Sequence, residues 1–151
     1  MLGMLLVILF LTYTRRKKMN IINQYGKDLY LLLCYQGFLP DTAKLITAQA
    51  AHESGNFTSS IFIVNNNPFG MKHPEVRKTT SLGENRGYAY YMTLESAVQD
   101  YWLYYKARKY PYTWKDADQF VEALKERFYF EAPLELYKKA VKHFYKLYFS
   151  E

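Results

Sequence analysis

The sequence predicts an α+β domain that is mostly helical, with an N-terminal hydrophobic helix before it. Half of the 151 residues are apolar, which is enough for one buried core. Apolar side chains recur at helical spacing along most of the chain, whereas only residues 76–92 have the pattern of a β-hairpin. No repeat, low-complexity tract or Gly/Ser linker interrupts the chain. We therefore expect a short anchor over residues 1–18 and one domain over residues 19–151.

The N-terminal segment is predicted to be a membrane anchor. Residues 2–13 are almost wholly apolar, and the basic block Arg15–Lys18 follows them. As a helix the apolar run measures about 18 Å, shorter than the ~30 Å hydrocarbon core of a bilayer. A cleaved signal peptide normally carries its positive charge before the apolar run and small residues at the cleavage site. We therefore expect residues 2–18 to remain attached and to reach lipid headgroups through the basic side chains, whether the segment spans the membrane or lies in it.

Two helices are expected at the start of the domain. The first covers residues 21–38. Its apolar face is formed by Ile22, Tyr25, Leu29, Leu32 and Leu33. The second covers residues 42–53, with Asp41 as its N-cap. Residues 54–72 contain three consecutive asparagines, a proline and two glycines, and this composition predicts an irregular segment.

A β-hairpin is expected next, with arms at residues 77–80 and 88–91 and a turn at 83–87. Thr93 is a suitable N-cap for a third helix that continues to about Tyr110. These elements place one small β element between the second and third helices.

Two further helices complete the predicted fold. Asp116 and Gln119 have capping-box spacing and predict a helix through about Phe128. Pro133 suits the first turn of the last helix. The buried stripe expected on that helix consists of Leu136, Tyr137, Ala140, Phe144 and Leu147.

Charge and cysteine content exclude several classes of function. The basic block accounts for four of the net +6 charges, and the remaining +2 is too small to predict a nucleic-acid-binding face. Cys34 is the only cysteine, so no internal disulfide is possible, and its apolar neighbours predict a buried thiol. The three histidines show no metal-ligand spacing, and His52-Glu53 is followed by Asn56 where a zinc-protease motif requires histidine. We expect no metal and no cofactor.

Glu53 is the candidate catalytic residue. It shares one helix face with Ile46 and Ala50, so its carboxylate is expected against the core or a cleft wall. Burial there and the negative end of the helix dipole both raise the pKa of the carboxyl group. A carboxyl group that stays protonated near neutral pH can protonate a leaving sugar oxygen. Periodicity alone also fits a carboxylate that simply reaches water at a helix end.

The loop Asn65–Gly70 is rich in residues that bond their own backbone. It can form a rigid wall of a groove beside Glu53, and its composition fits an ordinary structured turn equally well. The 16 tyrosines likewise fit either the edges of a small core or the aromatic lining of a carbohydrate groove.

Three segments resemble glycoside hydrolase family 73, the glucosaminidases of flagellar and autolysin type. The segment from Ala48 matches A-x-x-A-x-E-S-G, and N-N-P-F-G-M-K from Asn66 is similar to N-N-x-F-G-I-K. The segment from Tyr91, Y-M-T-L-E-S-A-V-Q-D-Y, resembles the stretch that follows the hairpin in the family. The resemblance implies a lysozyme-like helical domain with a small β-lobe across a groove. It also implies cleavage of the β-1,4 bond between N-acetylglucosamine and N-acetylmuramic acid, with Glu53 as the catalytic acid.

The second carboxylate of the family is the glutamate of a T-T-x-E motif in the hairpin. Here Thr79-Thr80-Ser81 is followed by Leu82, which departs from the motif. Glu84 is the nearest carboxylate and is our candidate, and Glu75 precedes the hairpin. A chain without a second carboxylate would act through Glu53 alone, as lytic transglycosylases do.

The resemblance also suggests further site residues. The family has a tyrosine four residues before a proline, and Tyr129 and Pro133 keep that spacing, which makes Tyr129 a candidate at the reaction centre; an aromatic contact between helices is the alternative. Asn67, Phe69 and Tyr91 are the candidates for binding the sugar.

These observations predict a peptidoglycan hydrolase, namely an endo-β-N-acetylglucosaminidase without a separate wall-binding module. Such a chain with a membrane segment fits a phage protein that acts during infection or host lysis, located in the bacterial envelope or a virion. The expected partners are the glycan strand, a lipid membrane and virion proteins, and not nucleic acid. The alternatives are a lytic transglycosylase and an inactive lysozyme-like structural protein of a virion.

Overall fold

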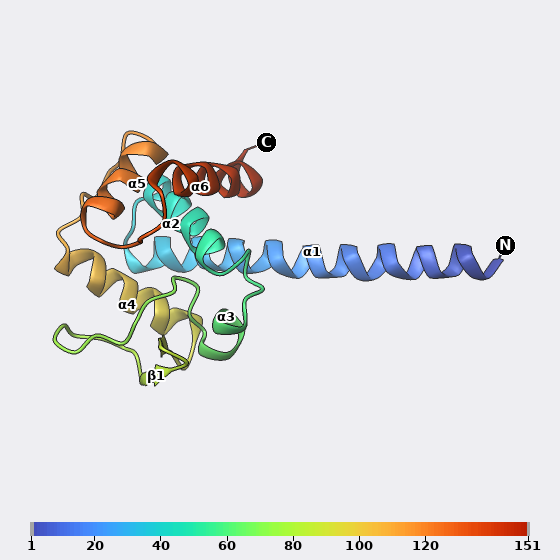
Figure 1. Cartoon of the computed structure of the whole chain (residues 1–151), viewed down its shortest axis with the longest axis horizontal. Helices are drawn as coiled ribbons and strands as arrows, with labels where there is room; N and C mark the ends of the chain where they lie inside the picture. Colours follow the sequence, from blue (N-terminus) through green and yellow to red (C-terminus); the bar gives the residue numbers. More distant parts are fainter. Residues whose placement is uncertain (1, 151) are drawn as a thin grey trace.

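The computed structural model describes residues 2–150, and within this range it describes all side chains except those of residues 2–11, 18, 19, 21 and 22. Six helices and a two-stranded antiparallel sheet are present in these residues, which confirms the mostly helical α+β class. The elements in chain order are α1 (Leu2–Gln36), α2 (Pro40–Glu53), α3 (Ser60–Asn65), β1 (Gly83–Asn85), β2 (Tyr88–Tyr90), α4 (Leu94–Ala107), α5 (Ala117–Glu126) and α6 (Leu134–Phe149). Figure 1 shows α2, α5 and α6 on one side of the C-terminal part of α1, and α4, α3 and the hairpin on the other.

Helix α1 is continuous from Leu2 to Gln36, so the predicted separate helix over residues 21–38 is wrong at its start. Residues 14–20 contain neither proline nor glycine, and nothing in them interrupts a helix. The expected division between residues 18 and 19 therefore falls inside one helix. Leu29 and Leu33 are fully buried, whereas the side chain of Ile22 lies outside the described residues.

The side chains of residues 2–11, which form most of the predicted membrane anchor, also lie outside the described residues. No helix within the described part of the chain combines the length and the apolarity needed to cross a bilayer.

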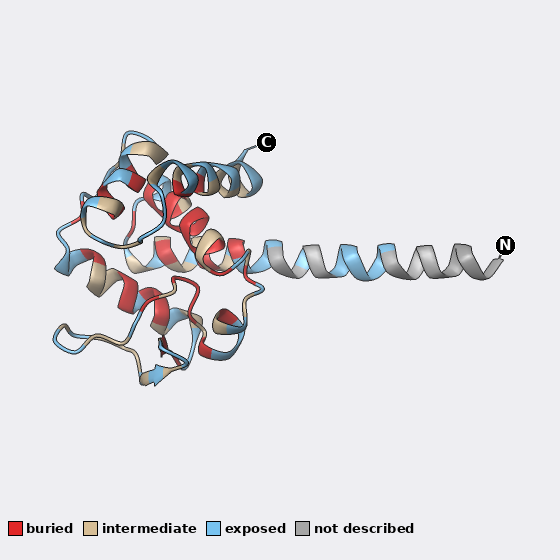
Figure 2. Ribbon diagram, viewed as in Figure 1, coloured by how far each residue is buried: buried red, intermediate tan, exposed pale blue. Residues whose placement is uncertain are grey.

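Helix α2 passes through the centre of the domain and packs on both α1 and α6. Most of its side chains are buried, as the red segments of Figure 2 show, and many are alanines that permit close helix packing. Asp41 is not the N-cap as predicted. The helix begins at Pro40, because proline is preorganised for the first helical position, and Asp41 instead pairs with Lys44 at 3.0 Å. Cys34 is a free, partly buried thiol rather than a fully buried one.

The β-lobe is smaller than predicted. The strands pair Gly83 with Tyr90, and the turn between them is Arg86-Gly87, both with positive φ as a tight hairpin turn requires. The predicted arm over residues 77–80 is instead a loop that is bound to Asp100. The segment predicted to be irregular contains the short helix α3, whose N-cap is Ser59.

The caps of the later helices follow the sequence closely. Thr93 forms a capping box with Ser96 at the start of α4, and Asp116 accepts a hydrogen bond from the Gln119 amide at the start of α5. The Gln119 side chain, however, accepts from the Lys115 amide rather than from the Asp116 amide. Helices α4 and α5 end three and two residues earlier than expected.

In helix α6 the predicted stripe is partly wrong. Pro133 is its N-cap residue, and the fully buried positions are Tyr137 and Val141. Leu136 and Leu147 are exposed, because the face that meets α2 and α5 is rotated from the predicted one.

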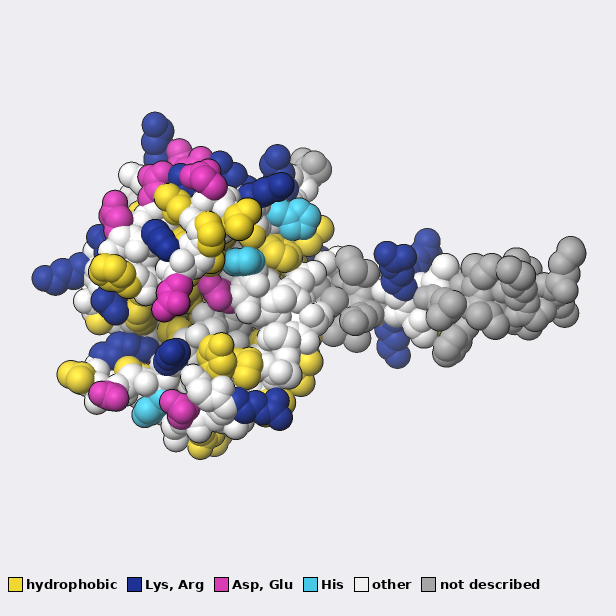
Figure 3. Space-filling view, in the orientation of Figure 1, with side chains coloured by type: hydrophobic (Ala, Val, Ile, Leu, Met, Phe, Trp, Pro, Cys, Tyr) yellow, Lys and Arg dark blue, Asp and Glu magenta, His cyan; other side chains and the backbone are white. Residues whose placement is uncertain are grey.

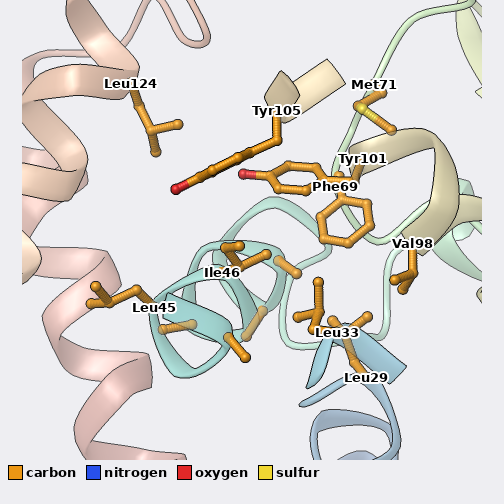
Figure 4. Close-up of a cluster of buried hydrophobic side chains, with 14 of the residues drawn as sticks. Leu29, Leu33, Leu45, Ile46, Phe69, Met71, Val98, Tyr101, Tyr105 and Leu124 are labelled. Carbon is orange, nitrogen blue, oxygen red and sulfur yellow. The ribbon is translucent and has the colours of Figure 1, made fainter. Parts of the chain in front are cut away.

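The core side chains meet between α1, α2 and α4. Figure 4 shows Leu29 and Leu33 below Ile46 and the rings of Tyr101 and Phe69. Phe69 comes from the loop after α3, and its ring stacks on Tyr101 with the ring centroids 4.3 Å apart. This stacking fixes the asparagine-rich loop to the helical body, beside the end of α2.

Candidate active site

A groove of about 1110 Å³ contains Glu53, and it is lined by the β-lobe on one side and by residues of α2, α4 and α6 and the segment after α5 on the other. Figure 3 shows it as a hollow across this face of the molecule. One wall comes from residues 67–77. The other comes from the end of α2, residues 128–132 and Tyr137 of α6. The groove predicted beside Glu53 is therefore present, and the asparagine-rich loop lines it.

Glu53 is the last residue of α2 and is partly buried. Burial raises the pKa of its carboxyl group above the usual value for glutamate. The phenol of Tyr137 donates a hydrogen bond to Oε1, and this bond favours the carboxylate and so opposes part of that rise. One oxygen of Glu53 is thus held by the protein, while the side chain faces the groove.

Tyr137 is itself held rigidly. Its ring stacks on Phe130 with centroids 3.7 Å apart and an interplanar angle of 5°, and the ring of His52 meets it edge-on at 4.7 Å. Burial raises the pKa of the Tyr137 phenol well above its usual value, so the phenol keeps its proton and donates a hydrogen bond to Glu53. Burial also lowers the pKa of His52, which favours its neutral form.

Gly70 brings the loop backbone against the carboxyl group of Glu53. Its φ is +62°, and a Cβ at this position would lie 3.3 Å from Oε2 of Glu53. Both the backbone conformation and the close contact therefore favour glycine. The two oxygens of Glu53 have distinct neighbours: the Tyr137 phenol at Oε1 and the Gly70 backbone at Oε2.

The loop before Gly70 is held by asparagine side chains. The Asn67 amide donates to the carbonyls of Met71 (2.8 Å) and Ala89 (2.9 Å), and its oxygen accepts from the Met71 amide. The Asn66 side chain donates to the carbonyl of Tyr91 at 3.0 Å. These bonds tie the loop to the hairpin and give the groove a rigid wall. They also occupy the polar atoms of Asn67, which is 1% exposed and serves to hold the loop rather than to present a free amide to a sugar.

Tyr129 lies on the opposite wall of the groove and donates a hydrogen bond to the Phe69 carbonyl at 2.6 Å. Burial raises the pKa of its phenol well above the usual value. Its segment is held by Lys125, whose ammonium donates to the carbonyls of Glu131 and Ala132, each at 2.9 Å. Tyr129 thus joins the two walls next to Glu53.

The candidates for a second carboxylate differ in position. Glu84 is exposed on β1, opposite Ala89, and is not among the residues that line the groove. Glu75 lines the groove on the β-lobe side, and Glu131 lines it on the helical side. The structure therefore brings Glu75 and Glu131 to the groove of Glu53, and it does not bring Glu84 there. Among the described residues no group of three or more His, Cys, Asp or Glu side chains could hold a metal ion.

A comparison with models of protein families identifies the family of the domain that contains this groove. The glucosaminidase model, described as mannosyl-glycoprotein endo-beta-N-acetylglucosaminidase, matches residues 41–149. The chain belongs to the glucosaminidase family. It is therefore a glycoside hydrolase that acts on the glycan of peptidoglycan. No curated protein and no solved structure matches the chain significantly.

Both aromatic residues predicted to bind the sugar, Phe69 and Tyr91, are part of the core of this glucosaminidase. Phe69 is 1% exposed, although it is among the residues that border the groove, and its ring stacks on Tyr101. Tyr91 is also buried, does not line the groove, and donates a hydrogen bond to Asp100 at 2.8 Å. Asp100 also accepts hydrogen bonds from both terminal nitrogens of Arg77, at 2.6 and 2.9 Å. This buried cluster connects the loop before the hairpin to α4.

Sequence reasoning missed two residues that shape the glucosaminidase site. Tyr137 was predicted only as an inward position of the last helix, and its bond to Glu53 depends on how α6 packs on α2. Phe130 follows Tyr129 in the chain, and no motif singled it out. Its role as the partner of Tyr137 arises from tertiary contact alone.

Proposed function

We propose that Glu53 is the general acid with which this glucosaminidase cleaves the β-1,4 glycosidic bond of the wall glycan, as an endo-β-N-acetylglucosaminidase. The proposal is carried by one observation: Glu53 is partly buried at the groove, with Oε1 held by the Tyr137 phenol. Burial keeps a proton on the carboxyl group to a higher pH than in water, and the bonded oxygen orients the group. These are the properties that an acid needs beside a leaving sugar oxygen.

In the proposed reaction the proton is on Oε2, because Oε1 accepts from Tyr137. Glu53 transfers this proton to the glycosidic oxygen as the bond between that oxygen and the anomeric carbon breaks. A water molecule then adds to the anomeric carbon and loses its proton to a base. The products are two glycan fragments, one of them with a new reducing end.

We propose Glu75, rather than Glu84, as the carboxylate that assists the water or stabilises the positive charge on the sugar. Glu75 lines the same groove as Glu53, whereas Glu84 does not. The alternative is a lytic transglycosylase that uses Glu53 alone, in which a sugar hydroxyl replaces water and an anhydro end is formed. Glu75 is exposed, and this observation favours the alternative over a mechanism with a buried second carboxylate.

The decisive experiment compares the glutamine variants of Glu53, Glu75 and Glu84 on purified peptidoglycan. We expect Glu53→Gln to lower kcat by about 10²- to 10⁴-fold, because glutamine keeps the acceptor for Tyr137 but cannot donate the proton. Glu75→Gln should lower kcat, and Glu84→Gln should not. Unchanged clearing of wall material by Glu53→Gln would show that Glu53 is not the acid. Another carboxylate of the groove would then have to protonate the leaving oxygen.

Mass spectrometry of the products separates the two reactions. New reducing ends support hydrolysis, whereas 1,6-anhydro ends support transglycosylation and remove the need for Glu75. Membership of a glycoside hydrolase family favours either enzymatic reaction, hydrolysis or transglycosylation, over the function of an inactive structural protein.

We also propose that residues 2–18 hold the enzyme at an anionic membrane surface. Apolar residues 2–13 precede the basic block, of which Arg15, Arg16 and Lys17 are exposed on α1. Changing all four basic residues of the block to glutamine should reduce sedimentation with phosphatidylglycerol vesicles, with phosphatidylcholine vesicles as the control. Equal sedimentation of the two proteins with anionic vesicles would refute the anchor. A role in phage infection or host lysis, in a virion or at the bacterial envelope, stays a prediction.

A further inference from the structure

Phe128 stands out on the rim of the groove. Its side chain is 89% exposed, although it lines the same groove as Glu53. A single exposed apolar side chain is common on protein surfaces and alone indicates nothing. The neighbouring rings differ from it: Tyr129 packs on Tyr101 and Tyr104, and Phe130 stacks on Tyr137. In the described part of the chain, Phe128 has no aromatic partner.

The backbone of Phe128 makes this exposure unusual. Helix α5 ends in a Schellman motif, in which the Phe128 amide donates to the Lys125 carbonyl (3.0 Å) and the Tyr129 amide donates to the Leu124 carbonyl (2.9 Å). The motif requires a left-handed residue, and Phe128 fills that position with a φ of +57°. Glycine is the usual residue there, since any Cβ is strained in this conformation.

The folded state therefore gains little from a phenylalanine at this position. The ring is not buried, and glycine would end the helix with less strain. Strained residues at a site indicate a role other than stability. The backbone of Phe128 is close to the residues that hold the acid: Phe130, two residues later, stacks on the Tyr137 that bonds Glu53, and two residues span at most about 7 Å of chain.

We propose that Phe128 is a carbohydrate platform, whose ring covers the apolar C–H face of a sugar in the glycan strand, at a subsite away from the cleaved bond. The proposal rests on the proposed function in one respect, that the glycan strand lies along the groove of Glu53. Aromatic rings suit this task because a sugar presents an apolar face, and the ring of Phe128 is rigid and already exposed. The left-handed backbone at Phe128 directs the ring outward while Tyr129, the next residue, turns into the protein and bonds Phe69.

The chain offers a matched control. Helix α4 ends in the same motif, with the Lys109 amide donating to the Lys106 carbonyl (3.0 Å) and the Tyr110 amide donating to the Tyr105 carbonyl (3.3 Å). Lys109 has a φ of +53° and does not line the groove. Lys109→Gly therefore relieves the same backbone strain without touching the proposed platform.

The test compares Phe128→Gly, Phe128→Tyr and Lys109→Gly in thermal unfolding, in kinetics and in binding to purified peptidoglycan. Both glycine variants should raise Tm, by roughly 3 °C. Only Phe128→Gly should also raise KM and weaken binding, each about tenfold, with little change in kcat. Phe128→Tyr should keep the binding of the unmodified protein.

Three results would overturn the platform. Unchanged KM and binding in Phe128→Gly would show that the ring does not contact the glycan. A lower Tm in that variant would show that the ring supports the fold. Weaker sedimentation of Phe128→Gly with lipid vesicles, with binding to peptidoglycan unchanged, would assign the ring to a membrane instead.

Binding is measured in the Glu53→Gln background, where the glycan stays intact. If that variant cleaves as fast as the unmodified enzyme, the acid assignment fails, and the platform is judged from the KM of Phe128→Gly in the unmodified enzyme. Failure of the proposed acid and failure of the platform thus give different results.

Discussion

Replacing Tyr137 with phenylalanine tests how the protein sets the acidity of Glu53. The substitution removes one hydroxyl group and keeps the ring that stacks on Phe130. The lost hydroxyl donates to Oε1 of Glu53, and this bond lowers the pKa of the carboxyl group against the larger effect of burial. Without the phenol only burial remains, so the pKa of Glu53 must rise further.

The size of the shift follows from the energy of the bond. A hydrogen bond to a charged group contributes about 1.5–3 kcal/mol, and each pKa unit corresponds to about 1.4 kcal/mol. The pKa of Glu53 should therefore rise by about one unit or more. Because Glu53 acts as an acid in its protonated form, the alkaline limb of kcat/KM against pH should move to higher pH by the same amount.

Stability gives an independent readout. The pKa of folded Glu53 is above its unfolded value, so the stability that its protonated form contributes is complete at low pH and is lost as the pH rises through the folded value. Tyr137→Phe should accordingly cost more stability at pH 8 than at pH 5, because the buried anion has lost its donor. In the Glu53→Gln background this pH dependence should disappear. An alkaline limb that stays in place or moves to lower pH would refute the assignment of Tyr137 as a positioning residue for the acid.

Two other substitutions test the walls around Glu53. Gly70→Ala should lower kcat by about tenfold or more in steady-state kinetics, with a smaller effect on KM, because the new Cβ lies 3.3 Å from Oε2 in a left-handed backbone conformation; unchanged kcat would contradict the close approach of the loop. Asp100→Asn should cost about 1.5–3 kcal/mol in urea unfolding, because it leaves Arg77, which is partly buried, without its anion. Burial raises the pKa of Asp100, but its hydrogen bonds and the attraction of Arg77 together outweigh burial and lower that pKa in the folded state. The stability it contributes is therefore present above the unfolded pKa and is lost as the pH falls through the folded value; an acid transition unchanged in Asp100→Asn would contradict that contribution.

The fold could be predicted from the sequence wherever its cause is local. Thr93 and Asp116 cap helices because a short polar side chain bonds an amide three residues ahead, and this depends on only four residues. Only the first arm of the hairpin was misplaced, because residues 77–80 are held by a distant group, Asp100, and not by a strand partner. In α6 the apolar spacing predicted a helix but not its orientation, because α2 and α5 together decide which face is buried.

The active site likewise has parts that depend on local sequence and parts that depend on tertiary contacts. Glu53 and the loop up to Gly70 lie in short motifs, where helix periodicity and backbone-bonding asparagines specify the local structure. The aromatic residues in those motifs, Phe69 among them, are used to hold that structure, and a buried ring cannot also cover a sugar. Phe128 and Phe130 also border the groove, and the spacing of Tyr129 and Pro133 specifies the residue type of neither. A motif marks the residues that must keep one geometry around the acid, so contacts with the glycan are better sought in the less constrained segments that face it.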